Sequence, residues 1–138
     1  PKADVCIGNH DRLASRKAFS GGVPKAWIKG YNEVLKTPKW NWVENVTYDN
    51  VCYEHGEGGD AYRKAQQNMQ SSVCGHTHTK AGVQYYVGKK YKVFGMQVGC
   101  GVNEKSYAAA YAKNFKRQAI GVGVVLDGNT AINVLMNL

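Results

Sequence analysis

Apolar residues in this chain occur in short runs that end near glycine, asparagine or aspartate, a pattern typical of strands joined by tight turns. The first run, residues 2–7, alternates apolar with polar side chains and ends at Gly8, as a half-buried strand does. The later runs predict strands over residues 40–48, 51–54, 72–74, 83–87, 91–98, 119–126 and 130–135.

Helical spacing or composition predicts helices over residues 12–20, 24–37, 60–70 and 107–114. Proline suits the first helical position, so the second helix is expected to begin at Pro24 and to end before Pro38. Asp60 can cap the third helix with its carboxylate. The fourth stretch is alanine-rich.

Turn sequences between successive strands predict three hairpins. These turns are Asp49-Asn50, Gly88-Lys89-Lys90 and Asp127-Gly128-Asn129. Hairpins combined with strands that precede helices indicate an α/β (α+β) fold. With 138 residues, of which 43% are apolar, the chain can form a single domain over residues 1–138.

Composition narrows the class of protein. No apolar run approaches the roughly 18 residues of a membrane span, and no secretory signal pattern is visible, so we expect no membrane partner and a cytoplasmic location. The net charge of +8 favours anionic partners such as phosphate esters or nucleic acid, but a soluble lysine-rich surface explains it equally well. The basic residues form no arm or tail.

Cysteine is the next candidate for chemistry, and the four cysteines are Cys6, Cys52, Cys74 and Cys100. Each lies in or beside an apolar run, so we expect small buried thiols in a reducing compartment. A zinc site is the alternative, because Cys52-x-x-His55 and Cys74-x-His76 could supply two cysteine and two histidine ligands. That alternative leaves the other two histidines unused.

The four histidines all stand near a glycine at the end of an expected strand. His76 and His78 are one residue apart, and residues i and i+2 of an extended segment point to the same side. His55 ends a strand and His10 lies in the turn after the first strand. If these strands share one sheet, the imidazoles converge on one volume, and imidazole is the commonest metal ligand in proteins. With an asparagine amide oxygen they suit Mn, Fe, Zn or Ni.

Three segments together resemble the calcineurin-like metallophosphoesterase family in their order and spacing. They are Gly8-Asn9-His10-Asp11, His55-Gly56 and Gly75-His76-Thr77-His78. The resemblance covers roughly residues 3–100. It implies a two-layer β sandwich flanked by helices and a phosphoester hydrolase that uses two metal ions. In such enzymes a metal-bound hydroxide attacks phosphorus while the ions stabilise the developing charge.

The resemblance also implies which residues bind metal. Asn9, His55 and His76 match the ligands of one ion of the pair, and His78 matches a ligand of the other. The implied cofactors are divalent ions: Mn, Fe, Zn or Ni.

Three further residues match the part of the family motif that acts on the substrate. His10 matches the histidine that contacts the phosphate and protonates the leaving oxygen. Asp11 is expected to orient the same turn, and Arg12 is a candidate phosphate contact. The implied substrate is a phosphoester, including nucleotides and nucleic acid.

The chain departs from the family pattern in its carboxylates. The family opens with an Asp-x-His strand and a Gly-Asp-x-x-Asp motif whose aspartate bridges the metals, and this sequence has neither. We therefore expect the C-terminal part of a metallophosphoesterase, incomplete at the N-terminus, with weak metal binding and little or no activity alone. Missing strands would also expose apolar surface, so we expect a homo-oligomer or a partner chain that supplies the absent half.

Two other functions remain open. The chain could be a non-catalytic metal-binding or interaction module on the same fold. It could also bind nucleic acid, for which clustered basic and aromatic residues are needed. Such a cluster is formed in the sequence by Lys36, Lys39, Trp40 and Trp42, which a hairpin packed on the core would explain equally well.

Overall fold

The computed structural model describes residues 1–102 and 118–137. Helices and strands are mixed along the chain, which confirms the expected α+β class. The alanine-rich helix expected over residues 107–114 lies outside the described residues.

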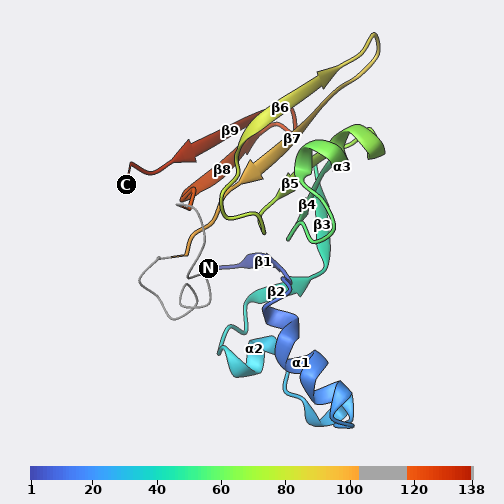
Figure 1. The fold of residues 1–138 in the computed structure, drawn as a ribbon, viewed down its shortest axis with the longest axis vertical. Coiled ribbons are helices and arrows are strands. Elements are labelled where there is room, and N and C mark those ends of the chain that lie inside the picture. Colours follow the sequence, from blue (N-terminus) through green and yellow to red (C-terminus); the bar gives the residue numbers. More distant parts are fainter. Residues whose placement is uncertain (103–117, 138) are drawn as a thin grey trace.

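A five-stranded sheet forms the centre of the molecule (Figure 1). In their order across the sheet, its strands are β3 (Asn45–Tyr48), β4 (Val51–Glu54), β5 (Ser71–Cys74), β7 (Lys92–Val98) and β6 (Ala81–Val87). The β4–β5 and β5–β7 pairs are parallel, whereas the outer pairs β3–β4 and β6–β7 are antiparallel hairpins. The parallel neighbours β4 and β5 therefore end at the same edge of the sheet.

Each face of the sheet is covered by a different element. One face carries α3 (Ala61–Asn68), and the other carries the hairpin of β8 (Gly121–Leu126) and β9 (Thr130–Leu135). Gly95 of β7 leaves room for α3, because a Cβ there would lie 2.5 Å from the Ala61 carbonyl oxygen. Phe94 and Met96 point to the opposite face, where they pack with Ala131 of β9.

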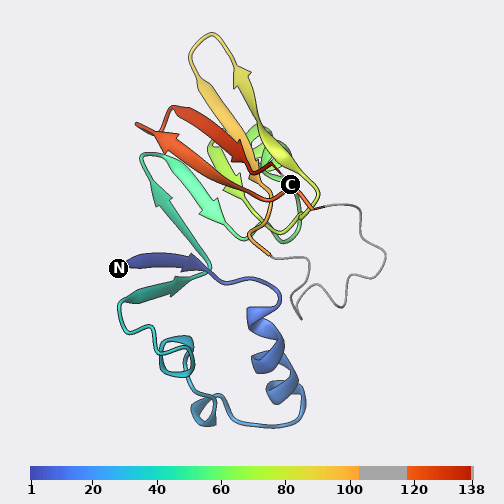
Figure 2. The same ribbon diagram turned by 90° about the vertical axis from the view of Figure 1, so that its left-hand side faces the viewer.

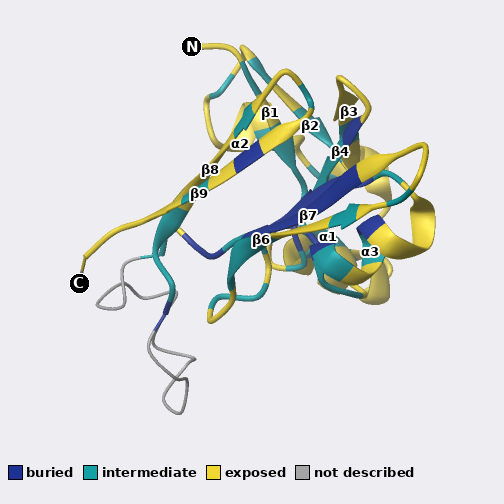
Figure 3. Cartoon of the chain, turned by 90° about the horizontal axis from the view of Figure 1, so that it is seen from above, coloured by how far each residue is buried: buried dark blue, intermediate teal, exposed yellow. Residues whose placement is uncertain are grey.

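Buried side chains gather on β7 and the strands beside it (dark blue in Figure 3). Phe94 and Met96 are each only 1% exposed, and Val51 and Val73 complete the buried cluster on this face. Each large apolar side chain buried in this way contributes about 1.5–3 kcal/mol relative to an exposed one. This layer therefore holds most of the stability of the described chain.

The elements before the sheet form what we call the N-terminal unit, residues 3–43. It comprises β1 (Ala3–Cys6), α1 (Asp11–Ser20), the 3-10 helix η1 (Lys25–Trp27), α2 (Tyr31–Val34) and β2 (Trp40–Val43). β1 and β2 pair in parallel as a separate two-stranded sheet, and β1 lies between β2 and the five-stranded sheet (Figure 2). None of the residues in α1, η1 or α2 is buried.

Two sequence predictions are wrong in this unit. The single helix over residues 24–37 is two short elements, because Ile28 is extended at φ −97° and ψ 121° and Gly30 is extended at φ −70° and ψ 158°. The single strand over residues 40–48 is divided at Glu44 into β2 and β3, which belong to different sheets. Periodicity alone could not detect that the chain changes sheets.

The three predicted hairpins are confirmed. Asp49 and Asn50 both have positive φ, at 47° and 61°, and Asp127 and Gly128 have φ of 51° and 62°. Two consecutive left-handed residues match the twist of the flanking strands, which is why Asx-rich and Asx-Gly turns mark hairpins in a sequence.

Candidate functional site

The ends of three strands meet at one place. β4 and β5 are parallel with Glu54 opposite Cys74, so the residues that follow, His55 and Gly75, lie side by side. The Gly75 N–H donates to the His55 carbonyl oxygen over 3.1 Å. β1 belongs to a separate sheet, so the assumption that all three strands share one sheet is wrong, yet its end still delivers Asn9 to His55.

Three side chains form what we call the donor cluster: Asn9, His55 and His76. His55 Nε2 lies 2.9 Å from Asn9 Oδ1 and 3.0 Å from His76 Nδ1. The two imidazole rings meet edge to face, with centroids 4.9 Å apart and an interplanar angle of 72°. The structure thus brings together the three residues that the resemblance implies as ligands of one metal ion.

The turn before α1 is shaped to hold His55. A Cβ on Gly8 would lie 2.7 Å from His55 Cε1 and 2.8 Å from Nδ1, so only glycine leaves space for the ring. The Gly8 N–H donates to Asp11 Oδ2 over 2.8 Å, which closes the turn. Asp11 therefore holds the turn that carries Asn9.

The loop after β5 holds His76 in a strained conformation. His76 has φ of 62°, and the Thr77 N–H donates to the Gly75 carbonyl oxygen over 2.7 Å, forming a γ-turn with a left-handed central residue. That turn is rare and costs about 1–3 kcal/mol for a residue with a side chain. Strain of this kind gathers at functional sites, where the surrounding structure maintains it.

A buried glutamine supports this loop and was missed by the sequence reasoning. Gln97 is 1% exposed, and its Nε2 donates to the Gly75 carbonyl oxygen while its Oε1 accepts from the Ala61 N–H at 3.1 Å. The signal available was a polar residue inside the apolar run of β7. Gln97 ties the strained loop to the start of α3.

The protonation of His55 and His78 decides whether their imidazoles can bind a cation. Burial lowers the pKa of His55, and the charge of His76 lowers it further. Burial likewise lowers the pKa of His78, with added repulsion from His76 and His10. His55 and His78 are therefore neutral at pH 7 and offer lone pairs rather than positive charge.

The donor cluster is suited to a cation on chemical grounds. One ring nitrogen has at most one hydrogen, so His55 Nε2 cannot donate to Asn9 Oδ1 and accept from His76 Nδ1 at once. Two ligands each about 2.1 Å from one ion at a right angle are about 3.0 Å apart, which agrees with both observed separations. The residues present therefore fit one divalent ion.

The described residues 1–102 and 118–137 contain no group of three or more His, Cys, Asp or Glu side chains placed to hold a metal. The donor cluster has two histidines and an amide oxygen, and thus no anionic ligand. The Cys52, His55, Cys74 and His76 zinc site is wrong, because it would be such a group. Cys74 Sγ instead donates to Glu54 Oε1 over 3.6 Å.

Two of the residues expected to act on the substrate, His10 and Arg12, lie at the start of α1. His10 is exposed and occupies the position before the first helical residue. The Arg12 guanidinium is ion-paired with Glu44 and, at 2.6 Å, with Glu57. Arg12 would have to leave these two carboxylates before it could contact a phosphate.

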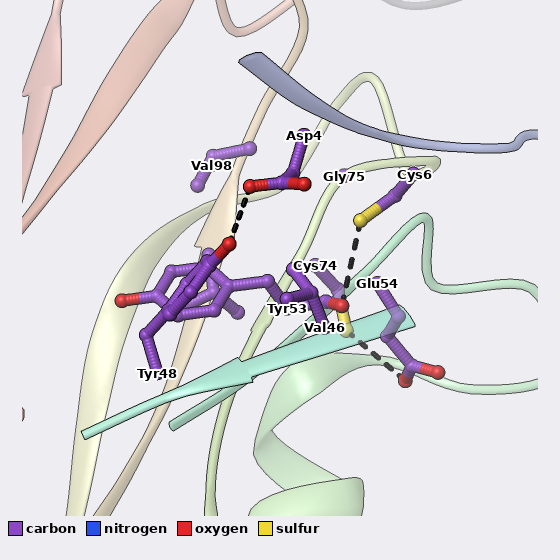
Figure 4. Close-up of a pocket in the computed structure, with 10 residues that line it drawn as sticks. Asp4, Cys6, Val46, Tyr48, Tyr53, Glu54, Cys74, Gly75 and Val98 are labelled. Carbon is purple, nitrogen blue, oxygen red and sulfur yellow. Dashed lines mark hydrogen bonds between the residues drawn. The ribbon is translucent and has the colours of Figure 1, made fainter. Parts of the chain in front are cut away.

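A cavity of about 400 Å³ lies next to the site, between β1 and the face of the sheet (Figure 4). Asp4 and Cys6 of β1 line one side, and Tyr53 and Cys74 lie on the other. Burial raises the pKa of Cys74 to about 12 and raises that of Cys6, so both thiols are protonated and unreactive at pH 7. The cavity lies between β1 and the five-stranded sheet, and no residue of the donor cluster lines it.

No helix within residues 1–102 and 118–137 combines the length and apolarity required to cross a bilayer. No protein-family model, curated protein or solved structure matches this chain.

Proposed function

We propose that this chain is part of a metal-dependent phosphoester hydrolase that uses Mn, Fe, Zn or Ni. The observation that carries the proposal is the convergence of three side chains from separate strand ends, with His55 Nε2 lying 2.9 Å from Asn9 Oδ1 and 3.0 Å from His76 Nδ1. When bound, a divalent ion supplies Lewis-acid chemistry, polarising a phosphoryl oxygen and lowering the pKa of water. The metallophosphoesterase-like sandwich and a dinuclear site are part of the same proposal.

In this proposal the residues of the turn act on the substrate. Asn9, His55 and His76 bind the ion, and His78 contributes to a second site. His10, exposed beside the cluster, donates its proton to the leaving oxygen. Asp11 keeps the turn closed through its hydrogen bond with the Gly8 N–H. Arg12 contacts the phosphate once a substrate draws it from its carboxylates.

The lack of negative charge in the donor cluster suggests that full activity requires ligands from outside it. The three donors are neutral, so they leave the charge of a divalent ion uncompensated. Carboxylate ligands usually supply the missing negative charge. We propose that another segment, another copy or a partner chain contributes them. Exposed apolar side chains on the outer face of β8–β9, such as Val122 at 61% and Val134 at 49%, are available for that association.

A metal-binding measurement tests this proposal without relying on turnover. Titration of purified chain with Mn²⁺, followed by electron paramagnetic resonance, is expected to show one bound ion. N9A, H55A and H76A should each weaken binding by about tenfold or more. Asn45 is exposed on β3 outside the cluster, so N45A is the matched control and should bind normally. Equal Mn²⁺ affinity in all four variants would contradict the proposal.

Hydrolysis of bis-p-nitrophenyl phosphate separates the two functions that remain. Turnover that rises with Mn²⁺ and falls in H10A supports the hydrolase. Mn²⁺ binding without turnover, once the segment or partner that supplies the carboxylates has been added, favours the non-catalytic metal-binding module, for which the neutral ligand set is the specific evidence.

A further inference from the structure

Positive charge is concentrated in the helical part of the N-terminal unit. Residues 11–39 hold seven Lys and Arg residues against two acids, Asp11 and Glu33, which is a net +5 of the +8 carried by the whole chain. We call this segment the basic segment. Charge that seemed dispersed along the sequence is thus largely placed on α1, η1, α2 and the loops between them.

Most of this charge is not neutralised by protein carboxylates. Arg12 is paired with Glu44 and Glu57, and Lys29 is paired with Glu33 at 2.9 Å. The remaining basic side chains have no salt bridge within the described residues; they are Arg16, Lys17, Lys25, Lys36 and Lys39. An anionic partner could engage all five without displacing an existing ion pair.

Exposed aromatic rings accompany these charges. Trp27 is 81% exposed and Phe19 is 77% exposed, and both sit among unpaired lysines along the chain. Both rings therefore present flat apolar faces to water. Aromatic faces beside a basic surface are what single-stranded nucleic acid requires, because bases stack on the rings while phosphates meet the charges.

The basic segment leads directly to the donor cluster. α1 begins at Asp11, one residue after His10 and two after Asn9. The segment occupies one end of the molecule, and the β6–β7 turn occupies the other (Figure 1). A strand lying along α1 would pass a phosphodiester close to His10 and the donor cluster.

We propose that the basic segment binds single-stranded nucleic acid and thereby delivers a phosphodiester to the donor cluster. The binding step stands on the charges and rings of residues 11–39 alone. The delivery step rests on the proposed hydrolase function. A protein partner would also cover Trp27 and Phe19, but it would have to supply a strongly acidic surface, so the charge favours nucleic acid.

The test measures fluorescence anisotropy of a labelled single-stranded oligonucleotide with the full chain in EDTA, so that hydrolysis does not enter. Binding is expected to weaken steeply with salt. The triple variant R16Q/K17Q/K25Q should reduce the slope of log affinity against log salt by about 2, since each single-strand phosphate contact contributes roughly 0.7. W27A should weaken binding by about tenfold, because it removes a stacking surface.

Matched controls come from the opposite end of the molecule. Lys89 and Lys90 are exposed in the β6–β7 turn, so K89Q/K90Q removes charge without touching the basic segment. This variant should bind within twofold of the native chain. Loss of binding in K89Q/K90Q equal to that in the triple variant would overturn the proposal, since the charge would then act non-specifically.

The alternative partner gives a different result. If the basic segment is a contact between copies, the oligonucleotide would not bind and sedimentation would show an oligomer that W27A dissociates. That outcome also overturns the proposal. Oligonucleotide binding without oligonucleotide hydrolysis in Mn²⁺, in a preparation that does hydrolyse bis-p-nitrophenyl phosphate, would keep the nucleic-acid surface and reject only the delivery step.

Discussion

The N-terminal unit and the five-stranded sheet are held together in different ways. The sheet has a buried cluster of Val51, Val73, Phe94 and Met96, covered by α3 on one face and the β8–β9 hairpin on the other. In the N-terminal unit no residue of α1, η1 or α2 is buried, and Gly8 is the one buried position among residues 3–43. The first region is stabilised by apolar burial, whereas the second relies on partly buried contacts, among them the Tyr31 ring stacked on Trp42 with centroids 4.7 Å apart.

Several polar contacts join the two regions at their boundary. Tyr48 donates to Asp4, Cys6 Sγ donates to the Tyr53 carbonyl oxygen over 3.4 Å, and Arg12 pairs with Glu57. The cavity of about 400 Å³ also lies there. The donor cluster spans this boundary, because His55 and His76 come from the well-packed sheet and Asn9 comes from the N-terminal unit. Site geometry should therefore be more sensitive to boundary contacts than global stability is.

The largest expected effect comes from the core of the sheet. F94A should lower the free energy of unfolding by about 3–5 kcal/mol, because it removes a fully buried ring. F19A, on the 77% exposed ring of α1, should change it by less than about 0.5 kcal/mol. Urea denaturation of both variants measures the difference. Equal losses would mean that α1 packs against a core after all.

A substitution at the boundary should affect the site more than the fold. The Cβ of G8A would lie 2.7 Å from His55 Cε1, so the ring must move, at a cost of about 1–3 kcal/mol. We expect a larger proportional loss of Mn²⁺ affinity, measured by titration, than of stability. Gly30 has open space around its Cβ position, so G30A is the control and should leave both quantities nearly unchanged.

The strain at His76 can be measured by comparing two substitutions. H76A and H76G both remove the imidazole, but glycine adopts φ of 62° freely. H76G should therefore be more stable than H76A by about 1 kcal/mol. At His78, which does not have a positive φ, the order should reverse. Thermal unfolding of H76A, H76G, H78A and H78G without metal measures these differences. If H76G is less stable than H76A, the loop relaxes when the imidazole is removed.

The smallest expected effect is the pH dependence of stability that comes from Asp60, at the start of α3. Asp60 accepts from the Arg63 N–H at 3.0 Å and pairs with Lys80, and these contacts lower the pKa of its carboxyl below the usual value of 3.8. The stabilisation is therefore complete above about pH 4 and is lost as pH falls through the folded-state pKa. D60N should lower the urea midpoint slightly at pH 7, and the difference from the native chain should shrink as the pH falls below the usual pKa of 3.8. A constant difference across that range would contradict this assignment.

Local sequence predicted the parts of the site that depend on few residues. Glycine beside each histidine marked the turns, and Asp60 marked the cap of α3 because its carboxylate satisfies a free helix N–H. The grouping of Asn9, His55 and His76 came from the resemblance to the metallophosphoesterase motifs, whereas their positions at strand ends indicated only that the histidines could converge. The support given by Gln97 could not be predicted, because its two partners, Gly75 and Ala61, lie far from it in sequence.

The sequence by itself determined most strands of the sheet and the three hairpin turns. These features follow from backbone preferences and side-chain periodicity, which act over a few residues. Tertiary structure decided that β1 joins β2 rather than the main sheet, that Arg12 is paired with two carboxylates and that His76 is left-handed. Each of these depends on contacts between distant segments, whose combined free energy outweighs any local preference.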